Sequence, residues 1–188
     1  MDDLVEVIRS FPIIAAVRHY ENLDEALRSG VNVIFLLTGD IFSIGDVVSK
    51  IKKNGKAAFV HADMIEGLGH DRASMEYIAK IIRPDGIIST RSYTIKYARE
   101  VGLFSIQRFF LVDSQGLNTG INEVRKSMPS AIEVLPGILH EKTGCVVSKV
   151  RTPVIAGGLI ESKADVILAL KAGAIAISAS KKELWFLE

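Results

Sequence analysis

The last two apolar runs of the chain end in small residues that could bind a phosphate. Ala156-Gly157-Gly158-Leu159 closes one run, and Ile177-Ser178-Ala179-Ser180 closes the next. Glycines let backbone N–H groups approach an anion closely, and the Ser180 hydroxyl adds a further donor. The alternative is that Gly157 and Gly158 form only a tight turn. The serines that follow favour the phosphate site.

Two charged side chains lie at or inside other apolar runs. Arg18 directly follows the first run, where its guanidinium could pair with a phosphate or carboxylate through two hydrogen bonds. A salt bridge from Arg18 to Glu133 or Asp113 is the alternative. Glu133 lies inside the run 131–135, where a carboxylate is costly to bury unless it is paired, and Arg108 is its expected partner. Glu133 is therefore either a structural residue or a ligand contact.

Three further polar side chains, His61, Asp63 and Glu66, lie within six residues. They could form an acid–base group. As metal ligands they would offer too few converging positions from one loop, and their spacing matches no metal motif. We favour recognition of a ligand hydroxyl, with helix capping or ion pairing as the alternative. No catalytic residue, metal ion or cofactor is assigned from the sequence.

Eight compact apolar runs must position these residues. Each run is nearly continuous in hydrophobicity, which is typical of parallel strands covered on both faces. Between the runs lie amphipathic segments that begin near Ser, Asp or Asn and end near Gly or Pro, as helices do. The predicted strands are residues 13–17, 33–37, 57–60, 86–89, 106–112, 131–135, 154–156 and 174–178.

Eight strand–helix units without a linker predict an α/β fold, a small (β/α)8 TIM-type barrel of parallel strands in a single domain over residues 1–188. A short helix at about residues 3–10 would precede the first strand. An open doubly wound sheet is the structural alternative. The chain offers about 23.5 residues for each unit (188/8), whereas a usual barrel has about 250 residues in all. Large lids and inserted domains are therefore excluded.

Ligands of such barrels lie at the C-terminal ends of the strands, which selects the candidate ligand-binding residues. Thr90 and Asp113 join the residues above because they follow the fourth and fifth runs. The full candidate set is Arg18, His61, Asp63, Glu66, Thr90, Asp113, Glu133, Gly157, Gly158, Ser178, Ala179 and Ser180.

Composition limits the class of protein. Of 188 residues, 48% are hydrophobic, and 23 Lys and Arg against 22 Asp and Glu leave a net charge of +1. The apolar content excludes general disorder, and the total charge gives no sign of a polyanion binder. Because Cys145 is the single cysteine, no intrachain disulfide is expected. Short apolar runs and the acidic start Asp2-Asp3 predict a cytoplasmic protein without a membrane partner.

Several segments occur in an order typical of one known family. They are residues 35–41, 60–68, 84–91, 106–108, 113–114, 132–137, 156–160 and 184–185. Together they extend nearly end to end, and they resemble the glycerol uptake operon antiterminator family.

The resemblance implies a (β/α)8-like regulator that responds to glycerol 3-phosphate. It also implies leader mRNA as the partner, with the protein preventing premature transcription termination of glycerol-use operons. One segment departs from the family pattern, in which a small residue or Met and then Pro-Lys follow the sixth strand. This chain has Leu139-His140-Glu141-Lys142 there, so the charge and rigidity of the loop differ.

RNA binding requires a basic surface, so the resemblance predicts that Lys and Arg clusters gather on one face of the barrel. Alternatively, the clusters only favour helix dipoles and keep the outer face soluble. The alternative function is a barrel enzyme, an isomerase, lyase or hydrolase of a small phosphorylated metabolite. No strand end carries the Lys of a Schiff-base aldolase. Turnover of the ligand would identify an enzyme, and saturable binding without turnover would identify a regulator.

Overall fold

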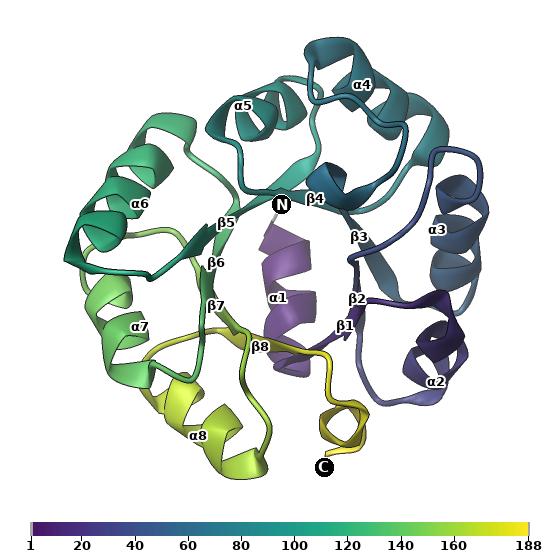
Figure 1. The fold of residues 1–188 in the computed structure, drawn as a ribbon. Coiled ribbons are helices and arrows are strands. Elements are labelled where there is room, and N and C mark those ends of the chain that lie inside the picture. The colour runs from purple at the N-terminus through teal and green to yellow at the C-terminus, as the bar shows by residue number, and fades with distance from the viewer. Residues whose placement is uncertain (1, 188) are drawn as a thin grey trace.

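Eight parallel strands close into a barrel in the computed structural model, which describes residues 2–187 (Figure 1). Each strand pairs with the next along the chain, and the last pairs with the first. The predicted single-domain (β/α)8 fold is thus confirmed, and the open sheet is excluded. The strands are β1 (Ile13–Val17), β2 (Val33–Leu36), β3 (Ala57–His61), β4 (Gly86–Ser89), β5 (Phe104–Phe110), β6 (Ala131–Leu135), β7 (Val154–Gly157) and β8 (Ala176–Ala179).

Helices cover the outside of the barrel (Figure 1). The α-helices are α1 (Asp2–Ser10), α2 (Leu23–Arg28), α3 (Ile44–Lys53), α4 (Arg72–Tyr77), α5 (Ser92–Glu100), α6 (Ser114–Ser127), α7 (His140–Val147) and α8 (Lys163–Lys171). Three 3-10 turns, η1 (Tyr20–Asn22), η2 (Ala62–Met64) and η4 (Lys182–Phe186), and the π-helical turn η3 (Ile78–Ile82) complete the helical elements of residues 2–187. Within these residues, no helix has the length and hydropathy needed to cross a bilayer.

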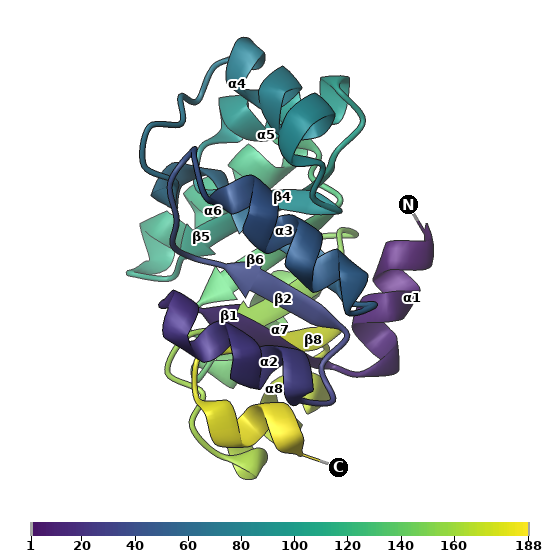
Figure 2. The same ribbon diagram turned by 90° about the vertical axis from the view of Figure 1, so that its right-hand side faces the viewer.

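Helix α1 lies across the end of the barrel at which the strands begin (Figure 2). Its Ile8 is fully buried and belongs to the same apolar cluster as Ile14, Phe35 and Phe59 inside the barrel. This end is therefore filled by apolar side chains. The opposite end, where the strands finish, faces the viewer in Figure 1.

Successive side chains along each strand point alternately into the barrel and toward the surrounding helices, which gives two apolar layers. On β3, Phe59 packs inside the barrel, whereas Ala58 and Val60 belong to the cluster between the strands and the helices. The same alternation places Ile106 on β5 and Ala131 on β6 inside. Because side chains two residues apart share a face of a strand, Arg108 and Glu133 also point inward, one step closer to the C-terminal end.

The structure differs most from the sequence prediction at β5, β8 and α7, whereas β2, β3 and β7 differ by one residue at their ends. Strand β8 begins at Ala176, two residues after the start of the predicted 174–178. Strand β5 begins and ends two residues earlier than the predicted 106–112. Helix α7 departs from the predicted helix starts near Ser, Asp or Asn, because its N-cap is Leu139, which supplies no side-chain hydrogen bond. The predicted domain limits of 1–188 include Met1 and Glu188, which lie outside the described residues.

Candidate functional site

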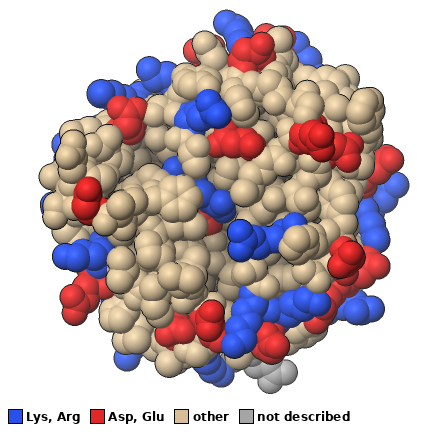
Figure 3. All heavy atoms as spheres, in the orientation of Figure 1, with Lys and Arg blue, Asp and Glu red and all other residues tan. Residues whose placement is uncertain are grey.

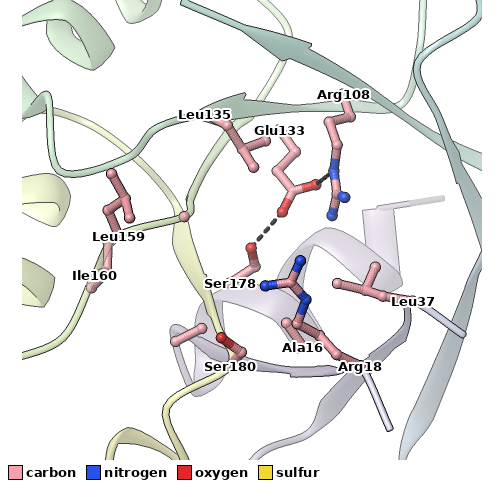
Figure 4. A pocket seen from close by; sticks show the side chains of 12 residues that line it. Ala16, Arg18, Leu37, Arg108, Glu133, Leu135, Leu159, Ile160, Ser178 and Ser180 are labelled. Atoms are coloured by element: carbon pink, nitrogen blue, oxygen red, sulfur yellow. Dashed lines mark hydrogen bonds and ion pairs between the residues drawn. The ribbon is translucent and has the colours of Figure 1, made fainter.

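A cavity of about 110 Å³ opens at the C-terminal end of the barrel (Figure 4). Its polar wall is formed by side chains from the ends of four strands, β1, β5, β6 and β8, and its apolar wall by the ends of β1, β2 and β6 and the loop after β7. The polar residues are Arg18, Arg108, Glu133, Ser178 and Ser180, and the apolar ones include Ala16, Leu37, Leu135, Leu159 and Ile160. The volume suits a small molecule rather than a dinucleotide-sized cofactor.

Arg108, Glu133 and Ser178 form a buried polar network along one side of the cavity. Arg108 Nε donates to Glu133 Oε2 at 2.6 Å, and the Ser178 hydroxyl donates to Glu133 Oε1 (Figure 4). Glu133 is fully buried and Arg108 is 6% exposed. Since Arg108 and Glu133 are register partners on β5 and β6, the pairing expected from the sequence is confirmed.

Gly157 makes room for this network. It lies on β7, between the strands that carry Glu133 and Ser178. A Cβ atom at position 157 would lie 2.5 Å from Ser178 Oγ and 2.6 Å from Glu133 Oε1. Both distances are shorter than a Cβ atom tolerates, so the Glu133–Ser178 hydrogen bond across β7 requires glycine here.

Arg18 points its guanidinium toward the same space as Arg108 (Figure 4). It forms neither of the salt bridges considered above, because Glu133 pairs with Arg108 and Asp113 lies outside the cavity. Among the residues that the structure describes, Arg18 has no hydrogen-bond or ion-pair partner. Since Glu133 offsets the charge of Arg108, the cavity keeps the positive charge of Arg18 and attracts anions.

Backbone donors line the same cavity. Within residues 2–187, the N–H groups of Gly158, Leu159 and Ser180 donate to no other group. Gly158 has a φ of +80° and Leu159 a φ of 58°, so the loop after β7 has two successive left-handed residues. Successive N–H groups in such turns form concave anion sites. The unpaired Arg18 therefore lies beside donors arranged for an anion.

His61 is buried behind the cavity rather than in its wall. It is 2% exposed, and its Nδ1 atom has no hydrogen-bond partner among the described residues. Burial and the positive charge of Arg108 lower the pKa of His61 to about 4, although Asp63 and Glu133 act in the opposite direction. His61 is therefore neutral at pH 7.

Asp63 and Thr90 bond to each other at the ends of β3 and β4. Asp63 accepts hydrogen bonds from the Thr90 N–H and hydroxyl and from the Ser89 hydroxyl, at 2.7 to 2.8 Å. Burial alone would raise the pKa of Asp63, but these hydrogen bonds outweigh it, and the pKa lies below its usual value. Neither residue lines the cavity. Both tie two strand ends together.

Glu66 and Asp113 also lie apart from the cavity. Glu66 is exposed, and its backbone pairs with the loop that contains Asp40. Asp113 is the N-cap of α6 and accepts from the Gly116 N–H at 2.7 Å. Of the twelve candidate residues, the structure brings six into the cavity wall and Gly157 directly beneath it. The six are Arg18, Glu133, Gly158, Ser178, Ala179 and Ser180.

Sequence reasoning did not assign Arg108 to the site, although it is the second cation of the cavity. Its position could have indicated this role, because Arg108 is a charged residue near the end of a strand, two residues after Ile106. Residues 140–142, which depart from the family pattern, begin α7 and do not line the cavity. Lys142 instead lines a neighbouring hollow with Val112 and Leu139.

The cations outside the cavity divide into paired and unpaired groups. Lys50 pairs with Asp24, Lys52 with Asp85 and Lys182 with Glu25. By contrast, Arg125, Lys149 and Arg151 converge on one hollow of about 390 Å³ at the N-terminal end of the barrel. None of these three forms an ion pair with another described residue. On the C-terminal face, Lys and Arg also gather near the barrel centre (Figure 3).

The fold and the cavity define a small (β/α)8-barrel protein with a cationic pocket at the C-terminal ends of its strands. The family model of the glycerol-3-phosphate responsive antiterminator matches residues 13–185, and the chain belongs to that family. The Escherichia coli K12 protein YgcP is 38% identical over 184 residues, which is 98% of this chain and 96% of YgcP.

Two solved structures support the family assignment. The glycerol uptake operon antiterminator regulatory protein from Listeria monocytogenes superposes with a TM-score of 0.89 at 35% identity, covering 92% of this chain and 94% of that one. An antiterminator-related protein from Thermotoga maritima gives a TM-score of 0.83 at 31% identity, covering 92% and 96%. The N-acetylmannosamine-6-phosphate 2-epimerase from Clostridium perfringens has 14% identity and a TM-score of 0.72, covering 94% and 88%, and shares the fold alone.

Proposed function

We propose that the chain is a transcription antiterminator that binds glycerol 3-phosphate in its C-terminal cavity and, in response, binds the leader mRNA of glycerol-use operons. The observation that carries the ligand assignment is the unpaired Arg18 beside the free N–H groups of Gly158, Leu159 and Ser180. Membership of the glycerol-3-phosphate responsive family supports the choice of this ligand over other small phosphates.

In this proposal the two ends of the ligand meet different walls. The phosphate lies against Arg18, the loop after β7 and the Ser180 hydroxyl, where a charge-assisted contact is stronger than a neutral one. The glycerol hydroxyls face Ser178 and Glu133, whose carboxylate accepts hydrogen bonds. His61, Asp63, Thr90 and Gly157 then act beneath or beside the ligand, by shaping the strand ends.

Thermal unfolding with three compounds tests the ligand. Glycerol 3-phosphate should raise the midpoint by mass action, inorganic phosphate less, and glycerol at the same concentration little or not at all. Equal shifts with glycerol and glycerol 3-phosphate would contradict the phosphate site. The same titration on Arg18→Gln should show a weakened response.

The enzyme alternative has less support from the cavity wall. The carboxylate of Glu133 is engaged by Arg108 and Ser178, and His61 lies behind the wall. The wall contains no lysine among the described residues, which leaves no Schiff-base nucleophile. Incubation of glycerol 3-phosphate with the protein, followed by phosphorus NMR, should show unchanged ligand. A new phosphorylated product, or release of inorganic phosphate, would favour the enzyme.

A further inference from the structure

A groove leads from the ligand cavity to the surface of the C-terminal face. Its volume is about 620 Å³, and it shares Arg18, Leu135, Gly158, Leu159, Ile160 and Ser180 with the cavity. Phe110, Glu161 and Lys181 line the groove but not the cavity. We call this feature the outer groove. An occupant of the outer groove would lie next to the bound ligand.

The outer groove combines exposed apolar and charged side chains. Phe110 is 52% exposed and Leu159 is 66% exposed, although both are large apolar residues. Lys181 and Arg18 form no ion pair with any residue that the structure describes. Phe110 belongs to none of the apolar core clusters of the described residues, so its ring is available to a partner. The combination indicates a surface for an anionic partner with a flat apolar part.

We propose that the outer groove binds an unpaired nucleotide of RNA, with its base stacked on Phe110 and its phosphate next to Lys181. Stacking on aromatic side chains and pairing of phosphates with cations are the two main contacts to single-stranded nucleic acid. The negative charge of Glu161 would repel a phosphate, so the groove does not suit phosphates alone. Its carboxylate can instead accept a hydrogen bond from a base amino group or a ribose hydroxyl. This proposal rests on the proposed function and locates its RNA contact.

The basic hollow of Arg125, Lys149 and Arg151 is the competing surface. It has three unpaired cations, but its apolar lining contains Met128, Pro129 and valines and no aromatic ring. It also lies at the opposite end of the barrel from the cavity. Such a hollow can bind the phosphates of an RNA whatever its base sequence, and it shares no residue with the ligand cavity.

Shared walls give the outer groove a direct connection to the ligand. Leu159 has the left-handed φ of 58°, which is uncommon for a non-glycine residue, and its side chain lines both spaces. A ligand phosphate held by the N–H groups of this loop would fix the position of the Leu159 side chain. A single segment then responds to ligand and RNA together, as coupling between two sites requires.

Three variants of the full chain test the location of the RNA contact. The RNA probe is a ligand-dependent binder selected from a random-sequence pool on the unmodified protein with glycerol 3-phosphate present. Phe110→Ala should weaken binding by roughly 5- to 150-fold, the range for loss of one stacked base, and Phe110→Trp should restore it. Phe42→Ala is the matched control, because Phe42 is 93% exposed and lies outside the outer groove.

Ligand binding and oligomeric state are measured on the same variants. Phe110→Ala and Lys181→Gln should keep the thermal shift with glycerol 3-phosphate, because neither residue lines the cavity. The proposal is overturned if Phe110→Ala binds the probe normally while Lys149→Glu with Arg151→Glu abolishes binding. It is also overturned if Phe110→Ala only dissociates a dimer in analytical ultracentrifugation. Failure to select any RNA would overturn the proposed RNA function itself, whereas a selected RNA indifferent to Phe110 would overturn only the outer groove.

Discussion

The Nε atom of Arg108 lies 2.6 Å from Glu133 Oε2, inside a barrel where both side chains are almost completely buried. The pair connects neighbouring strands β5 and β6 along one side of the cavity at the C-terminal end of the barrel. A buried ion pair costs desolvation energy, so removal of one partner leaves an uncompensated charge. Arg108 and Glu133 therefore shape the cavity, and substitution of either residue should lower the stability of the barrel.

Glu133→Gln should reduce the free energy of unfolding by about 3 to 5 kcal/mol, because Arg108 would stay buried without its counter-charge. Urea unfolding followed by circular dichroism measures this change. The control is Glu76→Gln, which removes a partly exposed partner of Lys80 and Arg72 and should change the stability little. Equal stabilities of the Glu133 variant and the unmodified protein would show that the pair is dispensable.

Gly157→Ala should destabilise the barrel by about 1 to 3 kcal/mol, since the added Cβ would meet Ser178 Oγ and Glu133 Oε1. Gly45→Ala is the matched control: a Cβ atom there meets nothing within 4 Å, and alanine favours helix α3. Thermal unfolding of both variants compares them. A Gly157 variant as stable as the Gly45 variant would contradict the close packing of the network.

Stability should fall between pH 7 and pH 5 because of His61. Its pKa is about 4 in the folded protein and about 6.5 when unfolded, so the unfolded chain binds the extra proton first and stability rises with pH over this window. At pH 5 the loss is about 2 kcal/mol. Asp63, whose pKa is lowered, adds a separate loss only below about pH 4.

Urea unfolding of His61→Gln at pH 7 and pH 5 checks this prediction. The variant should lose most of the stability difference between the two pH values. His19→Gln is the control, because His19 is exposed and should leave the difference as it is. An unchanged difference in the His61 variant would mean that another group controls the pH dependence.

Arg18→Gln should weaken glycerol 3-phosphate binding by about tenfold or more, because a charge-assisted hydrogen bond contributes about 1.5 to 3 kcal/mol. The stability without ligand should change by less than about 0.5 kcal/mol, since Arg18 is exposed and unpaired among the described residues. Isothermal titration calorimetry measures the affinity. Arg28→Gln, an exposed arginine away from the cavity, should bind normally.

The strands were predictable because strands buried on both faces have nearly continuous apolar sequences. Three of the eight predicted strand ranges, those of β1, β4 and β6, match the observed strands at both ends. Helix α7 was not predictable from its cap, because Leu139 offers no acceptor and the helix is held by packing. Propensity alone does not capture such tertiary support.

The site was predictable to the level of strand ends, but not to the level of individual contacts. Arg18 and Glu133 lie in the cavity wall, whereas Asp113 caps α6 and Asp63 bonds to Thr90. In the sequence, a carboxylate at a strand end looks the same whether it contacts a ligand, caps a helix or ties two strands together. Only the direction of its side chain separates ligand contact from capping, and tertiary structure sets that direction.

Leader-RNA binding measured with and without glycerol 3-phosphate tests the central claim most directly. The RNA is the leader of a glycerol-use operon from the genome that encodes this chain, and filter retention at low salt measures its affinity. We predict that glycerol 3-phosphate raises the affinity of the protein for the RNA. Because coupling between two binding sites is reciprocal, the RNA should raise the affinity for glycerol 3-phosphate by the same factor. Added salt should weaken the complex steeply as counterions return to the phosphates. RNA retention that is the same with and without glycerol 3-phosphate would contradict the account.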